Sequence, residues 1–469
     1  MSAPQTLHPA RLLMVMVLVT GAMFMEILDG TIITTALPSM AQSFGTSAIE
    51  LNIGVSAYLL ALGIFIPASG WIADRFGART IFALAITLFT ASSALCGGAQ
   101  SFAFFLTLRI LQGIAGAMMV PVGRLVVLRY TPKEKLMAAM SNLVWPALVA
   151  PVLGPPLGGF ITTHFGWRWL FYLNVPLGLA ALAACLAVVP QVREVESRPF
   201  DWPGFLLCGA GTFALLSGLE RAVVGIDVVC GALIAVGLGL LGVAIRHFRR
   251  AATPMLDLSS YAIPTFRVSL GGGSLLRMSI GSAPFLLPLM FQEGFGYDAF
   301  HSGLLVLALF AGNLGIKSIT TRILRRFGYR PVLIWNGVIC VLSLAACALL
   351  QPGTPVAVTV ILLAIGGMSR SMEFTTLSTL AFSDVPKPGI SHANGLFSTV
   401  SQIALAAGIT LAALGVRAGR LIANHFDLRA SGIDYRIAFL FVATIALVGL
   451  IDAMRLPRGA GDHFVDRPT

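Results

Sequence analysis

The sequence predicts an all-α polytopic membrane protein. Of its 469 residues 57% are hydrophobic and 11% are charged, whereas about a quarter of the residues of a soluble globular protein are charged. Apolar runs of about twenty residues, each long enough to cross a bilayer as a helix, follow one another along the chain. The net charge of +11 comes from basic residues that lie mostly in the short loops between these runs. This pattern is typical of membrane topology and argues against a nucleic-acid-binding surface.

The apolar runs predict fourteen transmembrane helices, grouped as six, two and six. They lie near 12–36, 51–73, 80–99, 102–128, 137–163, 168–189, 203–220, 226–245, 266–291, 300–320, 331–350, 355–382, 391–416 and 434–454. Because Lys and Arg collect in the loops assigned to the cytoplasm, we expect both termini inside and an uncleaved first span. The predicted outer loop 417–435 departs from this rule, since it contains several arginines. A loop of this length can form a surface helix.

An internal repeat supports this grouping. Arg75-Phe76-Gly77 recurs as Arg326-Phe327-Gly328, and Leu37-Pro38, Gly113 and Met118 recur as Leu287-Pro288, Gly367 and Met372, with the spacing always between 250 and 254 residues. The first six helices are therefore repeated as the last six in the same orientation, with two helices inserted between them. We expect a six-helix bundle in 1–190, two inserted linker helices in 191–255, and a second six-helix bundle in 256–469. Parallel repeats place a substrate site between the halves near the middle of the membrane.

Several short motifs accompany the predicted helices of the first half. In chain order they are Leu28-Asp29-Gly30-Thr31 with Ala36-Leu37-Pro38, Gly70-Trp71-Ile72-Ala73-Asp74-Arg75-Phe76-Gly77-Ala78-Arg79, Arg109-Ile110-Leu111-Gln112-Gly113, Gly154-Pro155-Pro156-Leu157-Gly158-Gly159, and Trp167-Arg168-Trp169 followed by Asn174-Val175-Pro176-Leu177-Gly178. Together they resemble the major facilitator superfamily, and more narrowly its fourteen-helix drug:proton antiporter branch, the EmrB/QacA type. The repeat of the second motif departs from the pattern, because Arg325 stands at the position of Asp74.

The resemblance implies the major facilitator fold, with two six-helix bundles plus two inserted helices. It also implies a proton-coupled secondary transporter that exports a small molecule by alternating access, as multidrug-efflux proteins do. No cofactor is expected, because the proton gradient supplies the energy. The expected partners are a small-molecule substrate, protons and membrane lipid, without nucleic acid, and the protein is expected to function as a monomer. The expected location is the bacterial inner membrane.

The loop between the second and third predicted helices carries Gly70, Asp74, Arg75, Gly77 and Arg79. Gly77 supplies the backbone freedom of a tight turn, and Asp74 can lie near a helix N-terminus, where the helix dipole favours a carboxylate. The resemblance implies that these residues form a conformational latch that holds the outward-open state. The plainer interpretation is a solvated loop whose arginines set the topology.

The fifth predicted helix is rich in glycine and proline, with an antiporter motif at Gly154, Pro155, Gly158 and Gly159. Small residues allow a neighbouring helix to approach closely, and proline kinks a helix and frees carbonyl groups. We therefore expect this helix to lie at the interface of the bundles and to bend or rock there.

Seven charged residues lie within the first and fourth helices of the two halves. They are Glu26, Asp29, Arg109, Arg124, Arg277, Arg370 and Glu373. At about 3 kcal/mol each, seven unpaired charges would cost roughly 20 kcal/mol in a bilayer, so pairing or a wet cavity is required. In the family these four helices line the central cavity.

We assign proton coupling to Asp29, with Glu26 as the rival carrier and Arg109 as the cation that could pair with Asp29. Glu26 and Asp29 are three residues apart and share one helix face. The candidate residues of the substrate cavity are Arg124, Arg277, Arg370 and Glu373, and the last two are spaced so that they can pair.

Other interpretations stay open. The buried charges could be salt bridges that only lock helices together. Because four arginines face three acids, the solute could be an anionic metabolite or a carboxylate, and the same fold also serves proton-coupled importers. An enzyme is not expected, since the chain lacks a P-loop, a zinc-binding H-E-x-x-H and a G-x-S-x-G elbow. The six cysteines lack metal-ligand spacing and are expected to be reduced packing residues, so no metal site is predicted.

Overall fold

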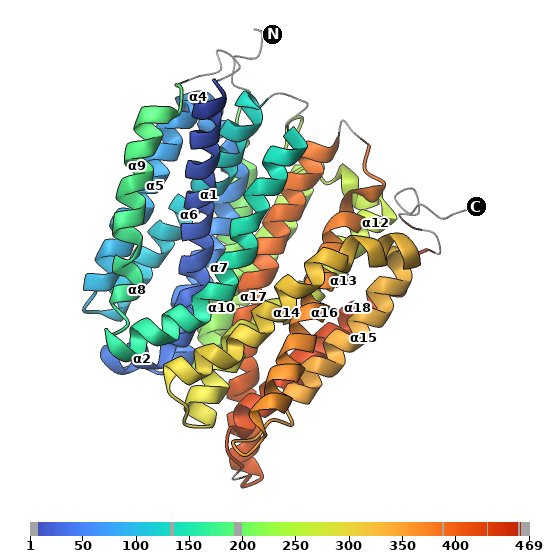
Figure 1. Cartoon of the computed structure of the whole chain (residues 1–469). Coiled ribbons are helices and arrows are strands. Elements are labelled where there is room, and N and C mark those ends of the chain that lie inside the picture. The colour runs from blue at the N-terminus through green and yellow to red at the C-terminus, as the bar shows by residue number, and fades with distance from the viewer. Residues whose placement is uncertain are drawn as a thin grey trace.

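The computed structural model describes residues 8–131, 136–191, 199–386, 389–428, 430–457 and 460, and within them the chain forms helices and no strand. Each of the fourteen predicted ranges overlaps one long helix or a helix with a short break. Thirteen of these helices are long and apolar enough to cross a membrane. The remaining range, the fifth, contains α7 (Leu136–His164), and some of the side chains of α7 lie outside the described residues. The start of α1 lies at the end of the bundle opposite α2 (Figure 1).

The helices follow the predicted order. The first half contains α1 (Pro9–Ile32), α2 (Leu37–Phe44), α3 (Ala48–Leu51), α4 (Ile53–Phe76), α5 (Ala78–Gly98), α6 (Phe102–Tyr130), α7, α8 (Trp169–Tyr172) and α9 (Asn174–Val188). The inserted pair is α10 (Trp202–Val224) and α11 (Val228–Phe248). The second half contains α12 (Pro264–Leu270), α13 (Gly272–Leu289), α14 (Ala299–Phe327), α15 (Tyr329–Cys347), α16 (Val356–Ser383), α17 (Ile390–His425) and α18 (Ile433–Ala453).

Capping side chains fix where several helices begin. Ser101, Asp201, Asp227 and Asp298 precede α6, α10, α11 and α14, and each accepts a hydrogen bond from the backbone N–H three residues further on. These bonds satisfy donors that have no partner within the helix. The apolar runs alone did not define these boundaries.

The internal repeat is visible at matching turns. Gly77 ends α4 with φ 92°, and Gly328 ends α14 with φ 79°, a region that glycine enters without the strain of a side chain. Beyond each turn an arginine ties the next helix to the last helix of its half. The Arg79 side chain donates to the carbonyl of Leu186, and Arg330 donates to the carbonyl of Met454 at 3.2 Å.

The repeat also preserves a close helix contact. A Cβ atom added to Gly113 on α6 would lie 2.4 Å from the carbonyl oxygen of Tyr58 on α4. A Cβ atom added to Gly367 on α16 would lie 1.8 Å from the carbonyl oxygen of Leu309 on α14. In each half the second and fourth helices therefore touch backbone to backbone, at positions that the repeat aligns.

The halves meet along two helix pairs, α7 with α14 and α4 with α17. A Cβ atom on Gly158 of α7 would lie 2.3 Å from the carbonyl oxygen of Ile32, and one on Gly159 would lie 2.3 Å from that of Ala299. The antiporter motif thus lies where α7 is wedged between α1 and α14, at the interface expected for it. The inserted helix α10 packs on α11 and also touches α17 and α4.

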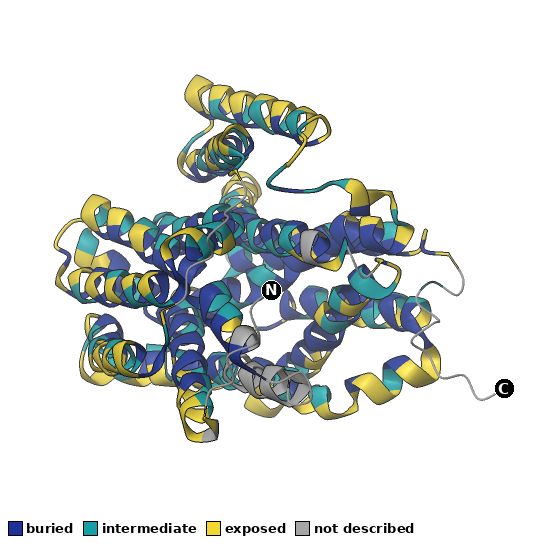
Figure 2. Ribbon diagram, turned by 90° about the horizontal axis from the view of Figure 1, so that it is seen from above, coloured by how far each residue is buried: buried dark blue, intermediate teal, exposed yellow. Residues whose placement is uncertain are grey.

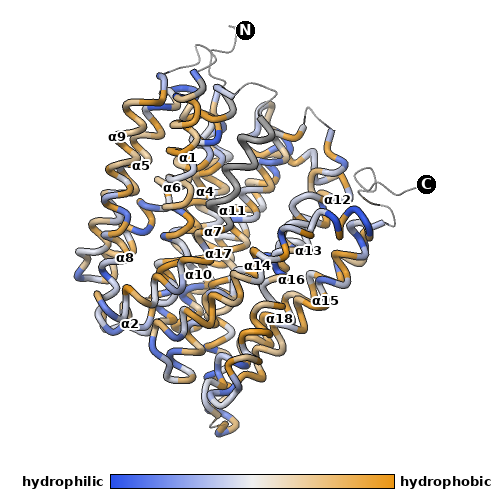
Figure 3. Tube along the Cα trace, in the orientation of Figure 1, coloured by the Kyte–Doolittle hydropathy of each residue, from blue (hydrophilic) through white to orange (hydrophobic). Residues whose placement is uncertain are grey.

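The outer faces of the helices are apolar. Large hydrophobic side chains such as Leu13, Trp335 and Val228 are exposed, and exposed residues follow the rim of the molecule seen from above (Figure 2). Hydrophobic colour covers most of the helices, and the hydrophilic residues gather toward their ends (Figure 3). A surface of this kind is expected where the surrounding solvent is lipid.

One helix is longer than predicted. The expected thirteenth helix ends at 416, whereas α17 continues to His425, so the connection to α18 is much shorter than the predicted loop 417–435. The extension is held by its arginines. Arg417 donates to the carbonyl of Ala222 at 2.8 Å, and Arg420 lies 3.2 Å from the Asp434 carboxylate. Arg429, also counted in that loop, lies outside the described residues.

Candidate functional site

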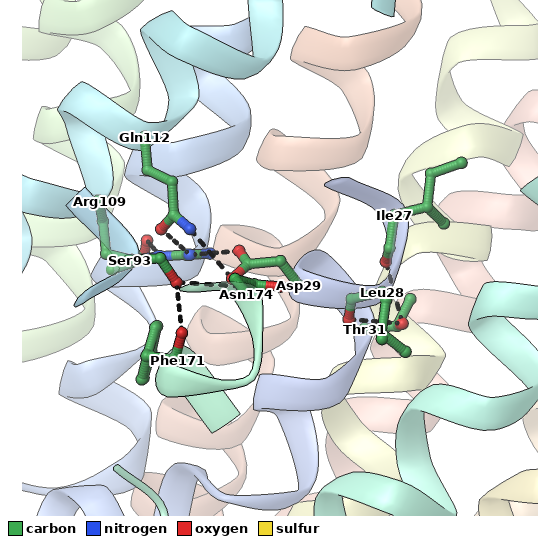
Figure 4. Close-up of polar contacts among 10 residues, drawn as sticks. Ile27, Leu28, Asp29, Thr31, Ser93, Arg109, Gln112, Phe171 and Asn174 are labelled. Carbon is green, nitrogen blue, oxygen red and sulfur yellow. Dashed lines mark hydrogen bonds and ion pairs between the residues drawn. The ribbon is translucent and has the colours of Figure 1, made fainter. Parts of the chain in front are cut away.

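Asp29 and Arg109 form a buried ion pair. Asp29 on α1 is 2% exposed, Arg109 on α6 is fully buried, and Arg109 Nη1 lies 2.7 Å from Asp29 Oδ2 (Figure 4). Both groups are removed from water, so each charge offsets the desolvation of the other. The predicted pair is confirmed.

Neutral side chains complete the surroundings of the Asp29 carboxylate. Gln112 Nε2 donates to Asp29 Oδ1 at 3.0 Å, and Asn174 Nδ2 donates to the same oxygen at 2.8 Å. Asn174 also donates to Ser93 Oγ at 3.0 Å, and Ser93 donates to the carbonyl of Phe171 at 2.9 Å (Figure 4). The carboxylate therefore joins α1 to α5, α6 and α9 through one hydrogen-bonded network.

Arg109 has contacts of its own beyond the carboxylate. Its Nη1 donates to Gln112 Oε1 at 2.6 Å, its Nε donates to the carbonyl of Gly54 at 3.4 Å, and its Cζ lies 4.4 Å from the centre of the Tyr58 ring. The face of an aromatic ring attracts a guanidinium. Nη2 of Arg109 has no hydrogen-bond partner. Because Gly54 and Tyr58 both belong to α4, the ion pair is in direct contact with a helix of the interface between the halves.

Glu26 lies close to this site without joining its hydrogen bonds. It is 8% exposed, and its Oε2 has no hydrogen-bond partner. Its side chain lies against Gly116 of α6, where an added Cβ would be 3.3 Å from Glu26 Cδ. Arg124, further along α6 and exposed, interacts with Glu26 electrostatically but forms no ion pair with it within 4 Å. The two acids of α1 thus have different surroundings.

Two arginines of the second half are buried with free donors. Arg277 on α13 is fully buried, donates from Nη1 to the carbonyl of Ser269 at 2.8 Å, and lies with Cζ 4.5 Å from the centre of the Phe397 ring. Its Nε and Nη2 have no partner. Arg370 on α16 donates from Nη2 to the carbonyl of Ile280, and its Nε has no partner. Within the described residues, no acid lies within 4 Å of either arginine to form an ion pair.

The predicted pairing of Arg370 with Glu373 is wrong. Their spacing places them on one side of α16, but neighbouring helices supply nearer partners. Arg370 turns to the carbonyl of Ile280 on α13, while Glu373 Oε2 accepts a hydrogen bond from Asn336 Nδ2 of α15 at 2.7 Å. Glu373 Oε1 has no partner. Arg370 and Glu373 therefore remain separate groups.

The loop predicted as a latch is tied to its own half by both arginines. Arg75 lies over the rings of Trp71 and Phe76, 5.5 and 5.9 Å from their centres, and Arg79 donates to the carbonyl of Leu186. No atom of the residues that the structure describes lies within 4 Å of a Cβ added to Gly70. Asp74, at the end of α4, is partly buried.

Glu220 is a buried acid that the sequence reasoning missed. It lies on α10 at 6% exposure, and its Oε1 accepts a hydrogen bond from Thr410 Oγ1 of α17 at 2.5 Å. The predicted helix 203–220 ended at this residue, whereas α10 continues to Val224 and takes Glu220 into the bundle. Because the predicted helix was too short, Glu220 was placed at its end and was not counted among the charges within the membrane.

No group of three or more His, Cys, Asp or Glu side chains able to hold a metal is present among the described residues. All six cysteines are free thiols, and five of them are buried, in agreement with the packing role predicted for them.

Comparison with known proteins agrees with this architecture. Residues 19–409 match the model of the Major Facilitator Superfamily. A protein named "Putative multidrug resistance protein MdtD" from Klebsiella pneumoniae is 36% identical over 458 residues, 96% of each chain, and a protein of the same name from Cronobacter sakazakii is 37% identical over 449 residues, 94% of each chain. The solved structure of an auto inhibited POT family peptide transporter, 15% identical, superposes with a TM-score of 0.69 over 98% of this chain and 99% of that chain. The chain is a multi-pass membrane transporter that belongs to the major facilitator superfamily.

Proposed function

We propose that this transporter is a proton-coupled multidrug-type exporter of the fourteen-helix antiporter branch, working by alternating access. The observation that carries the proposal is the buried Asp29–Arg109 pair, whose hydrogen bonds join α1, α5, α6 and α9. The names of the MdtD relatives, at 36 and 37% identity over nearly the whole chain, support the efflux role.

In this proposal Asp29 carries the proton. Protonation removes the charge that Arg109 pairs with, and Arg109 already contacts Gly54 and Tyr58 of α4. A change in the ion pair would therefore act directly on the α4–α17 contact between the halves. Glu26 is the alternative carrier, because it lies on the same helix with an unpartnered oxygen.

Other parts of the molecule have roles in the same transport cycle. The loop with Gly70, Asp74, Arg75, Gly77 and Arg79 acts as the latch when the halves change orientation, and α7 rocks about its glycine motif between α1 and α14. The two bundles are 1–190 and 256–469, with 191–255 as the insertion. The protein works as a monomer without a cofactor in the bacterial inner membrane, with both termini in the cytoplasm.

The experiment is efflux from proteoliposomes with an imposed proton gradient, for Asp29→Asn and Glu26→Gln. Asn keeps the shape of Asp29 but cannot exchange a proton. We expect Asp29→Asn to lose gradient-driven efflux by roughly two orders of magnitude, the effect of removing a positioned proton-transfer group. Glu26→Gln is expected to keep most of it. Unchanged gradient-driven efflux by folded Asp29→Asn would exclude Asp29 as the carrier, and the reverse ranking of the variants would transfer the role to Glu26.

A second candidate is the export of an anionic solute such as a carboxylate. The unpartnered Nε and Nη2 of Arg277 and Nε of Arg370 favour it, because a buried guanidinium donor without an acceptor is costly until an anion fills the place. Paired efflux assays with an organic cation and an organic anion distinguish the two candidates.

A further inference from the structure

A large apolar cavity lies between the inserted pair and the second half. Its volume is about 1090 Å³, and its walls come from α10, α11, α12, α13, α17 and the connection that follows α11. Leucine, isoleucine, valine and alanine side chains form most of the lining. This volume is at the upper limit for sites that hold drug-sized ligands, about 300–1,000 Å³. No residue assigned above to proton coupling or to the solute lines it.

The cavity is elongated along α17. Its lining includes Leu396 near the start of α17 and Leu411 about four turns later. At 1.5 Å per residue these positions are about 22 Å apart. One leaflet of the hydrocarbon core is about 15 Å deep, half of the 30 Å bilayer core. The cavity therefore has the length of one lipid leaflet with its headgroup region.

One end of the cavity is basic. Arg249, directly after α11, and Arg267, on α12, both line it and are exposed. Neither side chain forms a hydrogen bond or an ion pair within the described part of the chain. Asp257 lines the same end and accepts a hydrogen bond from the backbone N–H of Ser259 at 2.8 Å. Two unpaired guanidinium groups against one carboxylate favour an anion here.

A buried hydroxyl group in the wall also lacks a partner. Thr399 on α17 is 2% exposed and lines the cavity, and its Oγ1 has no hydrogen-bond partner among the residues that the structure describes. A threonine within a helix commonly donates to a carbonyl of the preceding turn, as Thr212 in the opposite wall does to the carbonyl of Cys208 at 2.8 Å. Thr399 can thus donate to a polar group that enters between the apolar walls.

We propose that this cavity is a binding site for an anionic phospholipid. The acyl chains lie along α17 between the inserted pair and α13, and the phosphate lies between Arg249 and Arg267. Thr399 donates to an ester carbonyl where the headgroup meets the chains. The inserted helices thereby build, with the second half, a lipid site distinct from the transport pathway.

The test is native mass spectrometry of the purified, delipidated protein incubated with phosphatidylglycerol or with zwitterionic phosphatidylcholine. We expect wild type to retain phosphatidylglycerol in preference. The double variant Arg249→Ala/Arg267→Ala should bind it roughly 30-fold more weakly, since each arginine contributes about fivefold toward an anionic headgroup. Thr399→Val should weaken binding of either lipid about fivefold, the effect of one hydrogen bond.

Arg246→Ala/Arg250→Ala is the matched control, because these arginines are exposed at the same end of α11 but do not line the cavity. It should bind like wild type, and equal loss in both double variants would overturn the proposal. Equal retention of the two lipids by wild type would also overturn it. Glycerol phosphate competes only for the headgroup position, so its displacement of the lipid at equal concentration would identify a site for a soluble anion instead.

Discussion

Asp29 and Arg277 are both buried and charged, but their hydrogen bonding differs. The Asp29 carboxylate accepts hydrogen bonds from Arg109, Gln112 and Asn174, whereas Arg277 makes one hydrogen bond and leaves Nε and Nη2 unpartnered. A buried polar group without a partner costs about 1–3 kcal/mol, and more when it is charged. A ligand that enters the bundle and accepts these hydrogen bonds would therefore stabilise Arg277 more than Asp29.

Replacement of Arg277 tests the charge of the solute. If the solute is an anion, Arg277→Ala should lower anion efflux about a hundredfold, and Arg277→Lys should restore only part of it, because lysine keeps the charge without the planar set of donors. Paired vesicle assays with an organic anion and an organic cation give the measurement, with Arg168→Ala, an exposed arginine that lies over Trp167, as control. Anion efflux at the wild-type rate in Arg277→Ala would exclude this arginine as a solute contact.

At this scale the charged pair was predictable, and its hydrogen bonds to neutral side chains were not. A charge in an apolar helix is costly, so Asp29 and Arg109 stand out in the sequence and their pairing could be expected. Gln112 and Asn174 belong to sequence motifs, but nothing in the motifs indicates that they contact Asp29. Ser93 carries no such cost and gives no signal. The expected pair of Arg370 and Glu373 failed for a related reason, because spacing on one helix says nothing about donors on neighbouring helices.

Among the elements, the inserted pair depends on the side chain that caps α10. Asp201 accepts hydrogen bonds from the backbone N–H of Gly204 at 2.9 Å and of Met255 at 3.0 Å, and lies 2.7 Å from His247 Nε2. It thus connects the start of α10 with the end of α11 and with the chain that leads to α12. Burial raises the pKa of Asp201, but hydrogen bonds from Met255, Gly204 and His247 outweigh this effect and hold the pKa below its usual value.

Asp201→Ala should lower the free energy of unfolding by about 1–2 kcal/mol at neutral pH, as expected for loss of a helix cap. Since the folded-state pKa is below the unfolded value, this contribution is complete above about pH 4 and disappears as the pH falls through the lowered pKa. Thermal unfolding of both proteins from pH 7 to pH 3 measures the difference. Ser101→Ala is the control, because Ser101 caps α6 without a charge, so its effect should not change with pH. An equal effect at every pH would contradict the proposed role of the Asp201 charge.

The hydropathy of the sequence predicted the long helices but not the residues at which they end. The apolar run of the thirteenth span stops near 416, but α17 continues to His425 because Arg417 and Arg420 find partners in Ala222 and Asp434. These partners lie far away in the sequence or on the next helix. The extended end also explains why arginines occur where the positive-inside rule disfavours them.

For the whole molecule, the repeat predicted which helices form equivalent groups, and matching contacts at Gly77 and Gly328 agree with it. The repeat could not predict how the halves contact each other, because it aligns positions within each half and gives no information about contacts between the halves. At the end where α2 lies, Gln292 Nε2 of the second half donates to the carbonyl of Thr35 of the first at 3.0 Å. Beside it, residues of both halves line a cavity of about 490 Å³.

Transport by alternating access requires these contacts at the α2 end to separate. Cysteines at Ser39 and Ala299, which line that cavity from opposite halves, should be joined by a short bis-methanethiosulfonate reagent. Joining them should hold this end closed and lower efflux about tenfold or more, and reductant should restore it, because the closed state alone remains populated. The pair Ser39→Cys/Thr163→Cys is the control, since both residues line the cavity from the first half. Undiminished efflux in the fully crosslinked pair across the halves would show that this end need not open, and alternating access between the halves would then be wrong.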